Sequence, residues 1–224
     1  MDAPLTLIPV NQLDRAKGRL STLLDARQRA ELALVTLTTA WHAALEVSSA
    51  VVILTADLRI PSLLGPRAVV LRESPDAHGL NEQLSLATST LIQERKLRED
   101  SCLLILHADL PLATPHAIQA LFAAAPPAPS VMIVRSADGG TNAMLQCPPG
   151  KLGLAYGSES AAKHEAAARN AGMVVAWHES PDLALDLDTP ADITMLLNLP
   201  AGWTSPAGRA LAAMGIRDRL GLHG

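Results

Sequence analysis

Apolar runs alternate with helical stretches along nearly the whole chain, and this alternation restricts the folds that the chain can adopt. Residues 50–57 contain the apolar run VVIL, which is typical of a strand buried on both faces of a parallel sheet. Residues 26–45 instead place Leu34, Leu37 and Trp41 at spacings of three and four, the period of a helix face. Strands that alternate with helices in this way predict an α/β sandwich with a mostly parallel sheet.

The predicted elements follow one another without an internal repeat or a low-complexity linker. The predicted strands span residues 6–10, 50–57, 67–73, 101–109, 129–138, 142–149 and 173–179. The predicted helices span residues 26–45, 81–97, 114–125, 160–172 and 189–199. Thr114 is expected to cap its helix with Pro115 in the first turn, and Gly172 to end another. We expect one domain over residues 1–200 and a tail at 201–224 with room for one short helix.

Composition excludes several classes of protein. Aromatic residues make up 2% of the chain and the formal net charge is -4, whereas nucleic-acid binders need stacking side chains or a basic surface. No apolar run approaches the roughly 20 residues of a membrane span, and the opening MDAPLTLIPV lacks the regions of a signal peptide. We therefore expect a cytoplasmic protein with small-molecule partners, without nucleic-acid or membrane partners, and leave a homodimer open.

The two cysteines, Cys102 and Cys147, each lie at the edge of an apolar strand. Without a secretion signal, we expect two reduced core thiols and not a disulfide. Neither cysteine has further ligand residues nearby, so a zinc site is not expected.

Charged side chains follow two of the predicted strands, at the carboxyl ends where α/β sheets bind ligands. Arg15, Lys17 and Arg19 follow the first strand and would suit a triphosphate, although a solvated charged loop has the same composition. Asp109 ends the run SCLLILHAD, just before Leu110 and a proline. A buried charge is costly unless it is paired, so Asp109 either caps the next turn or holds a cation.

Three further segments are candidates for anion and cation binding. Gly139 and Gly140 precede Thr141, and paired glycines let backbone N–H groups approach an anion closely. Ser158 and Ser160 stand at a predicted helix start, where the helix dipole favours phosphate; an ordinary turn and a serine cap are the alternative.

In LALDLDTPAD, residues 186 and 188 would lie on one face of an extended segment. Two close carboxylates suit a magnesium ion, although an acidic residue pattern at the start of an ordinary helix would look the same in the sequence.

The order of these segments resembles the 2-phospho-L-lactate guanylyltransferase family, which acts in biosynthesis of the deazaflavin coenzyme and is similar in fold to the molybdenum-cofactor guanylyltransferases. The resemblance extends from residue 7 to about 196. It rests on IPVNQLDRAKGRL, HGLNEQL, ILHADLPLATP, DGGTNAML, YGSESAAKH and LDLDTPAD. It implies a three-layer sandwich with a Rossmann-like sheet of the nucleotide-diphospho-sugar-transferase type over residues 1–200.

The resemblance also implies the reaction. GMP would pass from GTP to the phosphate of 2-phospho-L-lactate, phosphoenolpyruvate or 3-phosphoglycerate, and pyrophosphate would leave. Mg²⁺ is the implied cofactor, held by Asp109, Asp186 and Asp188. Lys17, Arg19 and Asp109 are the implied catalytic residues.

Further residues match the family's binding positions. The implied nucleotide-binding residues are Pro9, Lys17, Arg19, Gly79 and Asn81, with Leu80 between the last two. The implied acceptor-binding residues are Thr141, Asn142, Gly157 and Ser160, and His164 matches as well.

Two departures from the family pattern keep alternatives open. Asn11 stands where the family usually has a lysine, and Ser158 and Glu159 replace a proline and a glycine. One alternative is a nucleotidyltransferase of the same fold with a molybdopterin or sugar-phosphate acceptor, although the Gly-rich loop LAGGxSxRxG of those enzymes is absent. The other is a non-catalytic nucleotide-binding homologue, against which the three aspartates argue.

Overall fold

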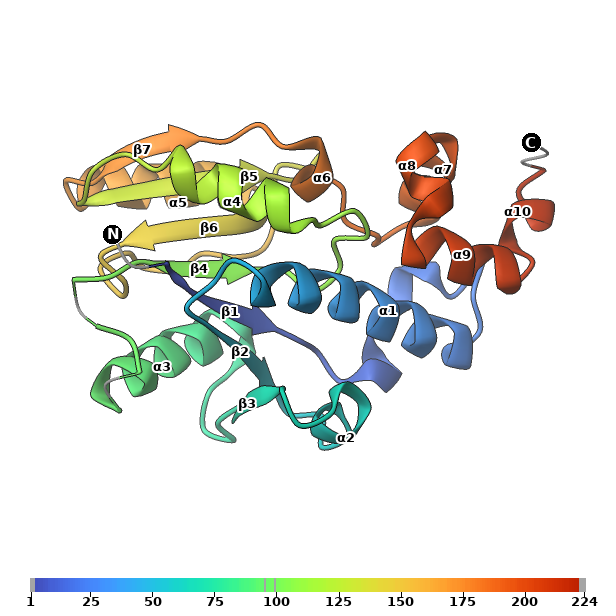
Figure 1. Ribbon diagram of the computed structural model, residues 1–224, viewed down its shortest axis with the longest axis horizontal. Helices are drawn as coiled ribbons and strands as arrows, with labels where there is room; N and C mark the ends of the chain where they lie inside the picture. The colour runs from blue at the N-terminus through green and yellow to red at the C-terminus, as the bar shows by residue number, and fades with distance from the viewer. Residues whose placement is uncertain (1–2, 95, 99, 222–224) are drawn as a thin grey trace.

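The computed structural model describes residues 3–94, 96–98 and 100–221 and is organised around one seven-stranded sheet (Figure 1). The strand order is β3-β2-β1-β4-β6-β5-β7. β6 is antiparallel to its neighbours β4 and β5, whereas all other neighbouring strands are parallel, which confirms the mostly parallel sheet. The strands are β1 (Leu5–Pro9), β2 (Ala50–Thr55), β3 (Val69–Arg72), β4 (Leu103–Leu106), β5 (Ser130–Arg135), β6 (Thr141–Cys147) and β7 (Val174–Trp177).

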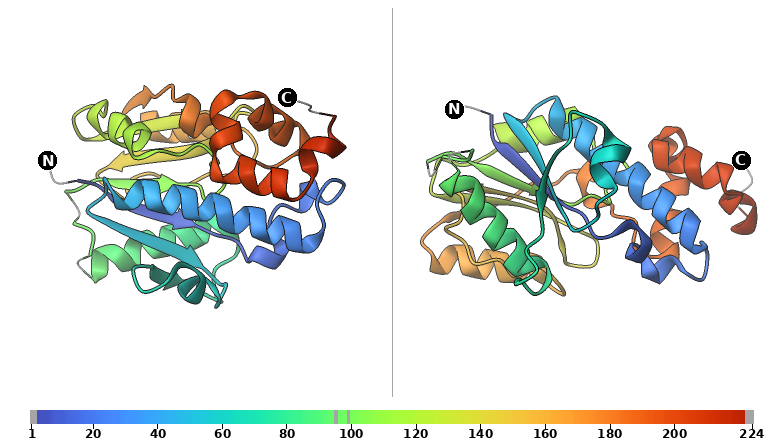
Figure 2. Two further views of the ribbon diagram at one scale, coloured as in Figure 1. Left: turned by 45° about the vertical axis from the view of Figure 1, so that its right-hand side comes forward. Right: turned by 90° about the horizontal axis from the view of Figure 1, so that it is seen from below.

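Helices cover both faces of the sheet, so the predicted three-layer sandwich is confirmed (Figure 2). Because successive strand residues point to opposite faces, Ile8 packs in the cluster of α1 and α4, whereas Leu7 packs in the cluster of α3 and α5. The larger helices are α1 (Ala26–Leu45), α3 (Gly79–Gln93), α4 (Pro115–Ala123), α5 (Ser160–Asn170) and α7 (Pro190–Asn198). The short ones that precede the tail are η1 (Leu13–Arg15), η2 (Gly18–Leu20), α2 (Ile60–Leu64) and α6 (Pro181–Ala184).

Local capping explains where several helices begin and end. α1 has the predicted bounds because Asp25 and Gln28 form a reciprocal capping box. The Thr114 hydroxyl accepts from the Ala117 N–H at 3.1 Å, as predicted for the start of α4. Gly172 follows α5 with φ 70°, a conformation that glycine adopts readily. α3 differs from the prediction because it starts at residue 79, and position 95 of its predicted range lies outside the described residues.

The strand before Asp109 is shorter than the predicted 101–109. β4 ends at Leu106, which pairs with Ala143, and the His107 N–H still donates to the Asn142 carbonyl at 2.9 Å. The chain then leaves the sheet. Asp109 consequently lies just beyond the carboxyl end of β4, where a ligand can reach it.

The tail contains three helices, where the sequence predicted at most one. They are α8 (Pro200–Thr204), α9 (Pro206–Ala213) and α10 (Ile216–Arg219), while residues 222–224 lie outside the described range. Figure 1 shows these helices beside the amino-terminal half of α1. Leu211 and Ile216 are fully buried there with Leu20, Leu24 and Leu32. This third apolar cluster, formed with residues far away in sequence, stabilises helices that are individually short.

The expectation of two reduced thiols is wrong in this structure, because Cys102 and Cys147 form a disulfide. β4 and β6 are antiparallel with Leu103 opposite Gln146, so the next pair along the ladder is Cys102 and Cys147. Their Cα atoms are 4.4 Å apart, within the range that a disulfide spans. The pairing depends on strand register, which cysteine count and compartment do not reveal.

No helix in the described part of the chain is both long and apolar enough to cross a bilayer. α1, with 20 residues, has the length but carries Arg27, Arg29 and Glu31 in its first two turns.

Candidate active site

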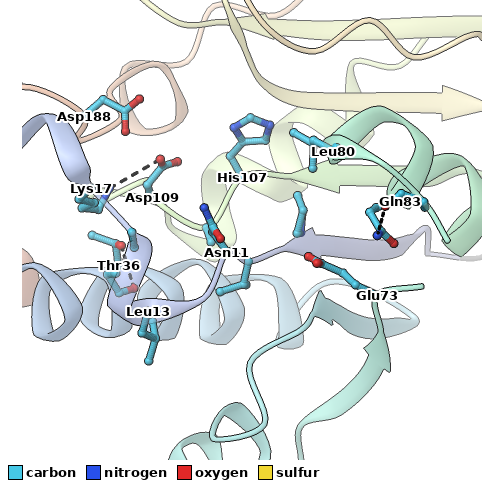
Figure 3. A pocket seen from close by; sticks show the side chains of 17 residues that line it. Asn11, Leu13, Lys17, Thr36, Glu73, Leu80, Gln83, His107, Asp109 and Asp188 are labelled. Carbon is cyan, nitrogen blue, oxygen red and sulfur yellow. Dashed lines mark hydrogen bonds and ion pairs between the residues drawn. The ribbon is translucent and has the colours of Figure 1, made fainter. Parts of the chain in front are cut away.

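A pocket of about 510 Å³ opens at the carboxyl ends of β1, β3 and β4 (Figure 3). Pro9, Lys17 and Gly79, all predicted to bind nucleotide, contribute to its wall. Ligand sites in open α/β sheets lie at this edge, and pockets of about 300–1,000 Å³ are typical for small molecules. Other lining residues are Val10, Asn11, Leu13, Ala16, Ala33, Thr36, Glu73, Ala77, Leu80, Gln83, His107, Ala108, Asp109 and Asp188.

The three aspartates predicted to bind metal meet at one end of this pocket. One carboxylate oxygen from each of Asp109, Asp186 and Asp188 lies within 4.8 Å of the other two. Leu187 is fully buried, and its N–H donates to the Asp109 carbonyl at 3.2 Å. Because Leu187 points into the core, the aspartates on either side of it turn toward Asp109.

The charges in this group are not balanced by protein groups alone. Burial and repulsion from Asp109 and Asp188 raise the pKa of Asp186 to about 7, and burial and repulsion from Asp109 also raise the pKa of Asp188. Oδ1 of Asp109 is buried and accepts no hydrogen bond from the described residues. Close carboxylates with an unused oxygen favour a bound cation, and oxygen ligands suit Mg²⁺. The residues therefore fit the predicted Mg²⁺ site.

Lys17 lies between the two segments that carry the aspartates. Its Nζ donates to the Leu187 carbonyl at 2.7 Å and lies 3.6 Å from Oδ2 of Asp109, and its side chain is only 4% exposed. Burial raises the pKa of Asp109, but the Lys17 ammonium and His107 outweigh it and keep that pKa below its ordinary value. Lys17 therefore ties the end of β4 to the segment before α7, besides reaching the pocket.

Arg19 and Asn81, both predicted to bind nucleotide, do not line the pocket in the described structure. Arg19 is exposed in η2, and its charge helps to lower the pKa of Asp188 against the stronger effect of burial. The Asn81 amide instead bonds the backbone of Tyr156: Nδ2 donates to its carbonyl at 3.1 Å, and Oδ1 accepts from its N–H at 2.7 Å. Asn81 thus fixes the residue before Gly157, and the nucleotide contacts of both residues stay predictions.

Thr141, Ser160 and His164 form a buried hydrogen-bonded group. The Ala155 N–H donates to Nε2 of His164 at 2.9 Å, so Nδ1 carries the proton of the neutral ring. Burial lowers the pKa of His164 to about 4. Nδ1–H then donates to Thr141 Oγ1 at 3.0 Å, and the Ser160 hydroxyl donates to the same oxygen at 3.1 Å. The hydroxyl hydrogen of Thr141 itself has no acceptor among the described residues.

Asn142 and Gly157, the other predicted acceptor residues, differ in exposure. Asn142 is buried, and its Nδ2 donates to the carbonyls of Leu183 and Ala184 at 3.0 and 2.9 Å, which holds the segment before Asp186. Gly157 is exposed with φ 129°, a backbone conformation that only glycine adopts without strain.

The departures from the family pattern at residues 158 and 159 lie on the surface. Both side chains are exposed, and Glu159 adopts a left-handed conformation with φ 54°. A Cβ atom placed on Gly139 would lie 3.1 Å from Oε1 of Glu159. The Glu159 carboxylate therefore packs over the glycine loop and does not line the pocket.

Two residues that the sequence pattern did not mark as site residues are important in the structure. The Tyr156 ring contacts His107 in a tilted arrangement and His164 edge-on, with ring centroids 5.2 and 4.7 Å away, and joins the pocket to the Thr141 group. Glu73 lines the pocket opposite the aspartates. The predicted strand 67–73 included Glu73, and only its place at the very end of that strand could have marked it as a site residue.

Comparison with known proteins agrees with this geometry. The sequence profile of the family described as "Guanylyl transferase CofC like" matches residues 5–203. A phosphoenolpyruvate guanylyltransferase of Sphaerobacter thermophilus is 35% identical, over 90% of this chain and 96% of the relative. A 3-phospho-D-glycerate guanylyltransferase of Colwellia psychrerythraea is 30% identical, over 85% of this chain and 89% of the relative.

Solved structures with similar folds have low sequence identity. A structure described as a nucleotide-diphospho-sugar transferase from Desulfovibrio desulfuricans superposes with a TM-score of 0.77 at 17% identity, covering 97% of this chain and 98% of the other. 4-Diphosphocytidyl-2C-methyl-D-erythritol synthase superposes with a TM-score of 0.61 at 15% identity, covering 88% and 97%. These likenesses confirm the nucleotide-diphospho-sugar-transferase type of fold.

Proposed function

Because this chain belongs to the family of CofC-like guanylyl transferases, we propose that it moves GMP from GTP to the phosphate of a small three-carbon acid. Similar proteins are named for phosphoenolpyruvate and for 3-phospho-D-glycerate, which makes these the first two acceptors to test. Phosphoenolpyruvate takes precedence, since it is named for several of the relatives. 2-Phospho-L-lactate, and a place in deazaflavin coenzyme biosynthesis, complete the same proposal.

One observation carries the proposal: three carboxylates converge at the end of a pocket large enough for a nucleotide. A nucleotide with its triphosphate at Lys17 and its base toward the start of α3 would place its phosphates beside Asp109 and Asp188. The reacting phosphorus would then lie next to the cation that the carboxylates favour.

The reaction is a direct displacement. An oxygen of the acceptor phosphate bonds to the α-phosphorus of GTP, while the bond from that phosphorus to the bridging oxygen of pyrophosphate breaks. The attacking oxygen is already ionised at neutral pH, so the chain needs no general base and forms no covalent intermediate. Its residues position the two substrates and offset charge. A Mg²⁺ held by Asp109, Asp186 and Asp188 would supply further charge compensation at the α-phosphate.

Lys17 and Thr141 are suited to the two substrates. The Lys17 ammonium already faces Asp109, and it would contact a triphosphate oxygen from the same position. The Thr141 oxygen accepts from both His164 and Ser160, so its own hydrogen is available to an acceptor's carboxylate or phosphate. The free backbone of Gly157 would allow the acid to approach that hydroxyl.

The proposal is tested by incubating the purified chain with GTP, Mg²⁺ and each of the three acids in turn, and measuring pyrophosphate. We expect pyrophosphate and the guanylylated acid in equal amounts with at least one acid, and neither from the Asp188→Asn variant. Metal-dependent GTP binding without pyrophosphate from any acid would contradict the proposal and favour the non-catalytic alternative. Turnover only with a molybdopterin or a sugar phosphate would favour the other nucleotidyltransferase alternative.

A further inference from the structure

Glu73 is an acidic side chain without a partner at the end of the pocket away from the aspartates. It follows β3 directly, is half-buried and points into the pocket in Figure 3. Within the described part of the chain, its carboxylate has neither a hydrogen bond nor an ion pair, and burial raises its pKa. A half-buried carboxylate whose oxygens are unused is suited to ligand groups that donate hydrogen bonds.

The backbone around Glu73 is held in place. Its N–H donates to the Thr55 carbonyl at 3.3 Å, which continues the pairing of β2 and β3 by one residue. The buried Gln83 fixes the next residues, because its Oε1 accepts from the Ser74 N–H at 2.9 Å while Nε2 donates to the carbonyls of Ser74 and Ala77 at 2.7 and 3.1 Å. The carboxylate is thus presented on a prearranged segment.

The division of charge along the pocket shows which part of a nucleotide Glu73 would meet. Lys17 and the cation-binding aspartates lie at one end and suit the phosphates. A triphosphate would avoid Glu73, because two anionic groups repel in a partly buried site. The base is the part of the nucleotide that remains for this end, where Leu80 adds apolar surface.

Of the common bases, guanine matches this end of the pocket. Its N1–H and 2-amino group are adjacent donors, and a carboxylate can accept from both. Adenine and cytosine instead present an unprotonated ring nitrogen beside their amino group. This nitrogen is a hydrogen-bond acceptor and would repel the carboxylate oxygens, which are acceptors as well. α3 also begins without a side-chain cap, so the N–H groups of its first turn, which starts at Gly79 on the pocket wall, suit the guanine O6.

We propose that Glu73 selects guanine by accepting hydrogen bonds from N1–H and the 2-amino group of the bound base. This inference rests on the proposed function, because it takes the pocket to be the nucleotide site of the transferase. It adds a residue that sets base specificity, separate from those that hold the phosphates or the acceptor.

The test measures nucleotide binding without acceptor and therefore without turnover. GTP, ITP and ATP compete in Mg²⁺ buffer against a fluorescent N-methylanthraniloyl-GTP, with the wild-type chain, Glu73→Gln and the matched control Glu31→Gln. Glu31 is exposed on α1 outside the pocket, and its substitution changes the net charge by the same amount. ITP lacks the 2-amino group, so the wild-type chain should bind it less tightly than GTP.

Glu73→Gln keeps one acceptor oxygen and places an amide donor against a guanine donor. We expect it to weaken GTP binding roughly 10- to 100-fold, to weaken ITP binding less, and to leave ATP binding unchanged or tighter. Glu31→Gln should bind all three nucleotides like the wild-type chain.

Three results would overturn the inference: equal wild-type affinities for GTP and ATP, an unchanged GTP-to-ITP ratio in Glu73→Gln, or an equal loss for all three nucleotides in that variant. Circular dichroism of Glu73→Gln establishes that the variant is folded. Failure of the proposed function is a separate result: tight, Glu73-dependent GTP binding without pyrophosphate from any acid would leave the base selection standing.

Discussion

At the scale of single residues, Asp109 has two carboxylate oxygens in different surroundings. Oδ2 lies 3.6 Å from the Lys17 ammonium, whereas Oδ1 is buried and has no hydrogen-bond partner in the described structure. Oδ2 is therefore paired with the Lys17 ammonium, whereas Oδ1 is available to a ligand. This arrangement distinguishes Asp109 from a residue that only caps a turn.

Asp109→Asn should abolish turnover while the fold persists. The amide keeps the size of the side chain but removes the negative charge that the cation site needs, and we expect a loss of at least about 100-fold in kcat, as for other groups that stabilise charge in the transition state. Pyrophosphate release during a Mg²⁺ titration measures the effect, and circular dichroism controls for folding. Near-normal turnover at limiting Mg²⁺ would show that Asp109 is not a metal ligand.

Lys17→Ala should impair GTP use more strongly than acceptor use. The variant loses a phosphate contact of about 1.5–3 kcal/mol, the range for hydrogen bonds to charged groups. It also loses the bond to the Leu187 carbonyl, which holds the Asp186–Asp188 segment. KM for GTP is measured beside Lys151→Ala, an exposed lysine outside the pocket. Equal kinetics of the two variants would contradict the role of Lys17.

Thr141→Val should affect both stability and acceptor binding. The Ser160 hydroxyl and Nδ1–H of His164 lose their common acceptor, and an unsatisfied buried donor costs about 1–3 kcal/mol of unfolding free energy. The acceptor loses the Thr141 hydrogen, so its KM should rise while that of GTP stays. Urea unfolding and steady-state kinetics measure both effects, with Thr141→Ser as the control that keeps the hydroxyl. Wild-type values for Thr141→Val in both measurements would rule out this role.

At the scale of elements, α7 connects the active site to the tail. Its capping box involves Thr189 and Asp192, and Oδ2 of Asp192 also accepts from the Asp188 N–H at 3.0 Å. At the other end of α7, a Cβ atom on Gly202 in α8 would overlap the Leu196 carbonyl oxygen. The position of Asp188 therefore depends on a helix that packs closely against the first helix of the tail.

Gly202→Ala should destabilise the protein, because its methyl group would overlap backbone atoms of α7. Overpacking typically costs about 1–3 kcal/mol of unfolding free energy and can cost more where backbone must move. Gly153→Ala is the matched control, since its Cβ would meet no atom within 4 Å. Urea unfolding compares the two variants. A Gly202→Ala protein as stable as Gly153→Ala would show that the close packing of α7 and α8 contributes little.

At the scale of the whole molecule, the disulfide and the third apolar cluster join distant parts of the chain. The disulfide links residues 45 positions apart and lies at the opposite end of β4 from Asp109. The third apolar cluster joins the tail to Leu20, Leu24 and Leu32. The cluster stabilises the packing of the tail on the sheet domain. The disulfide stabilises the pairing of β4 and β6 at the end away from the site.

Reduction of Cys102–Cys147 should lower the unfolding free energy by about 2–4 kcal/mol, as expected for a closed loop of this length. Activity should persist under native conditions, because the bond is remote from the aspartates. Urea unfolding with and without reductant measures the effect. The double variant Cys102→Ala/Cys147→Ala is the control, since reductant should not change its midpoint. A wild-type midpoint that is insensitive to reductant would contradict a stabilising disulfide.

The order and type of the main elements, and several of their ends, could be predicted from local sequence patterns. α1 matches its prediction because its apolar period and the cap at Asp25 are local signals. The same holds for Thr114 at the start of α4 and Gly172 after α5. Alternation along an extended segment predicted that Asp186 and Asp188 share a face. Their grouping with Asp109 was implied by the family resemblance, and the three carboxylates do lie together in the structure.

Which distant groups meet could not be predicted from the sequence and depends on the folded chain. Lys17 bonds a carbonyl 170 residues away, and Cys102 pairs with Cys147 because two antiparallel strands have a particular register. The tail forms three helices because a cluster from the other end of the chain buries them. Glu73 belongs to a pocket whose wall also comes from the ends of β1 and β4 and from α3, so it exists only in the folded chain. The physical reason is common to all four: local propensity fixes backbone conformation over a few residues, whereas burial, register and charge pairing depend on neighbours that folding alone brings together.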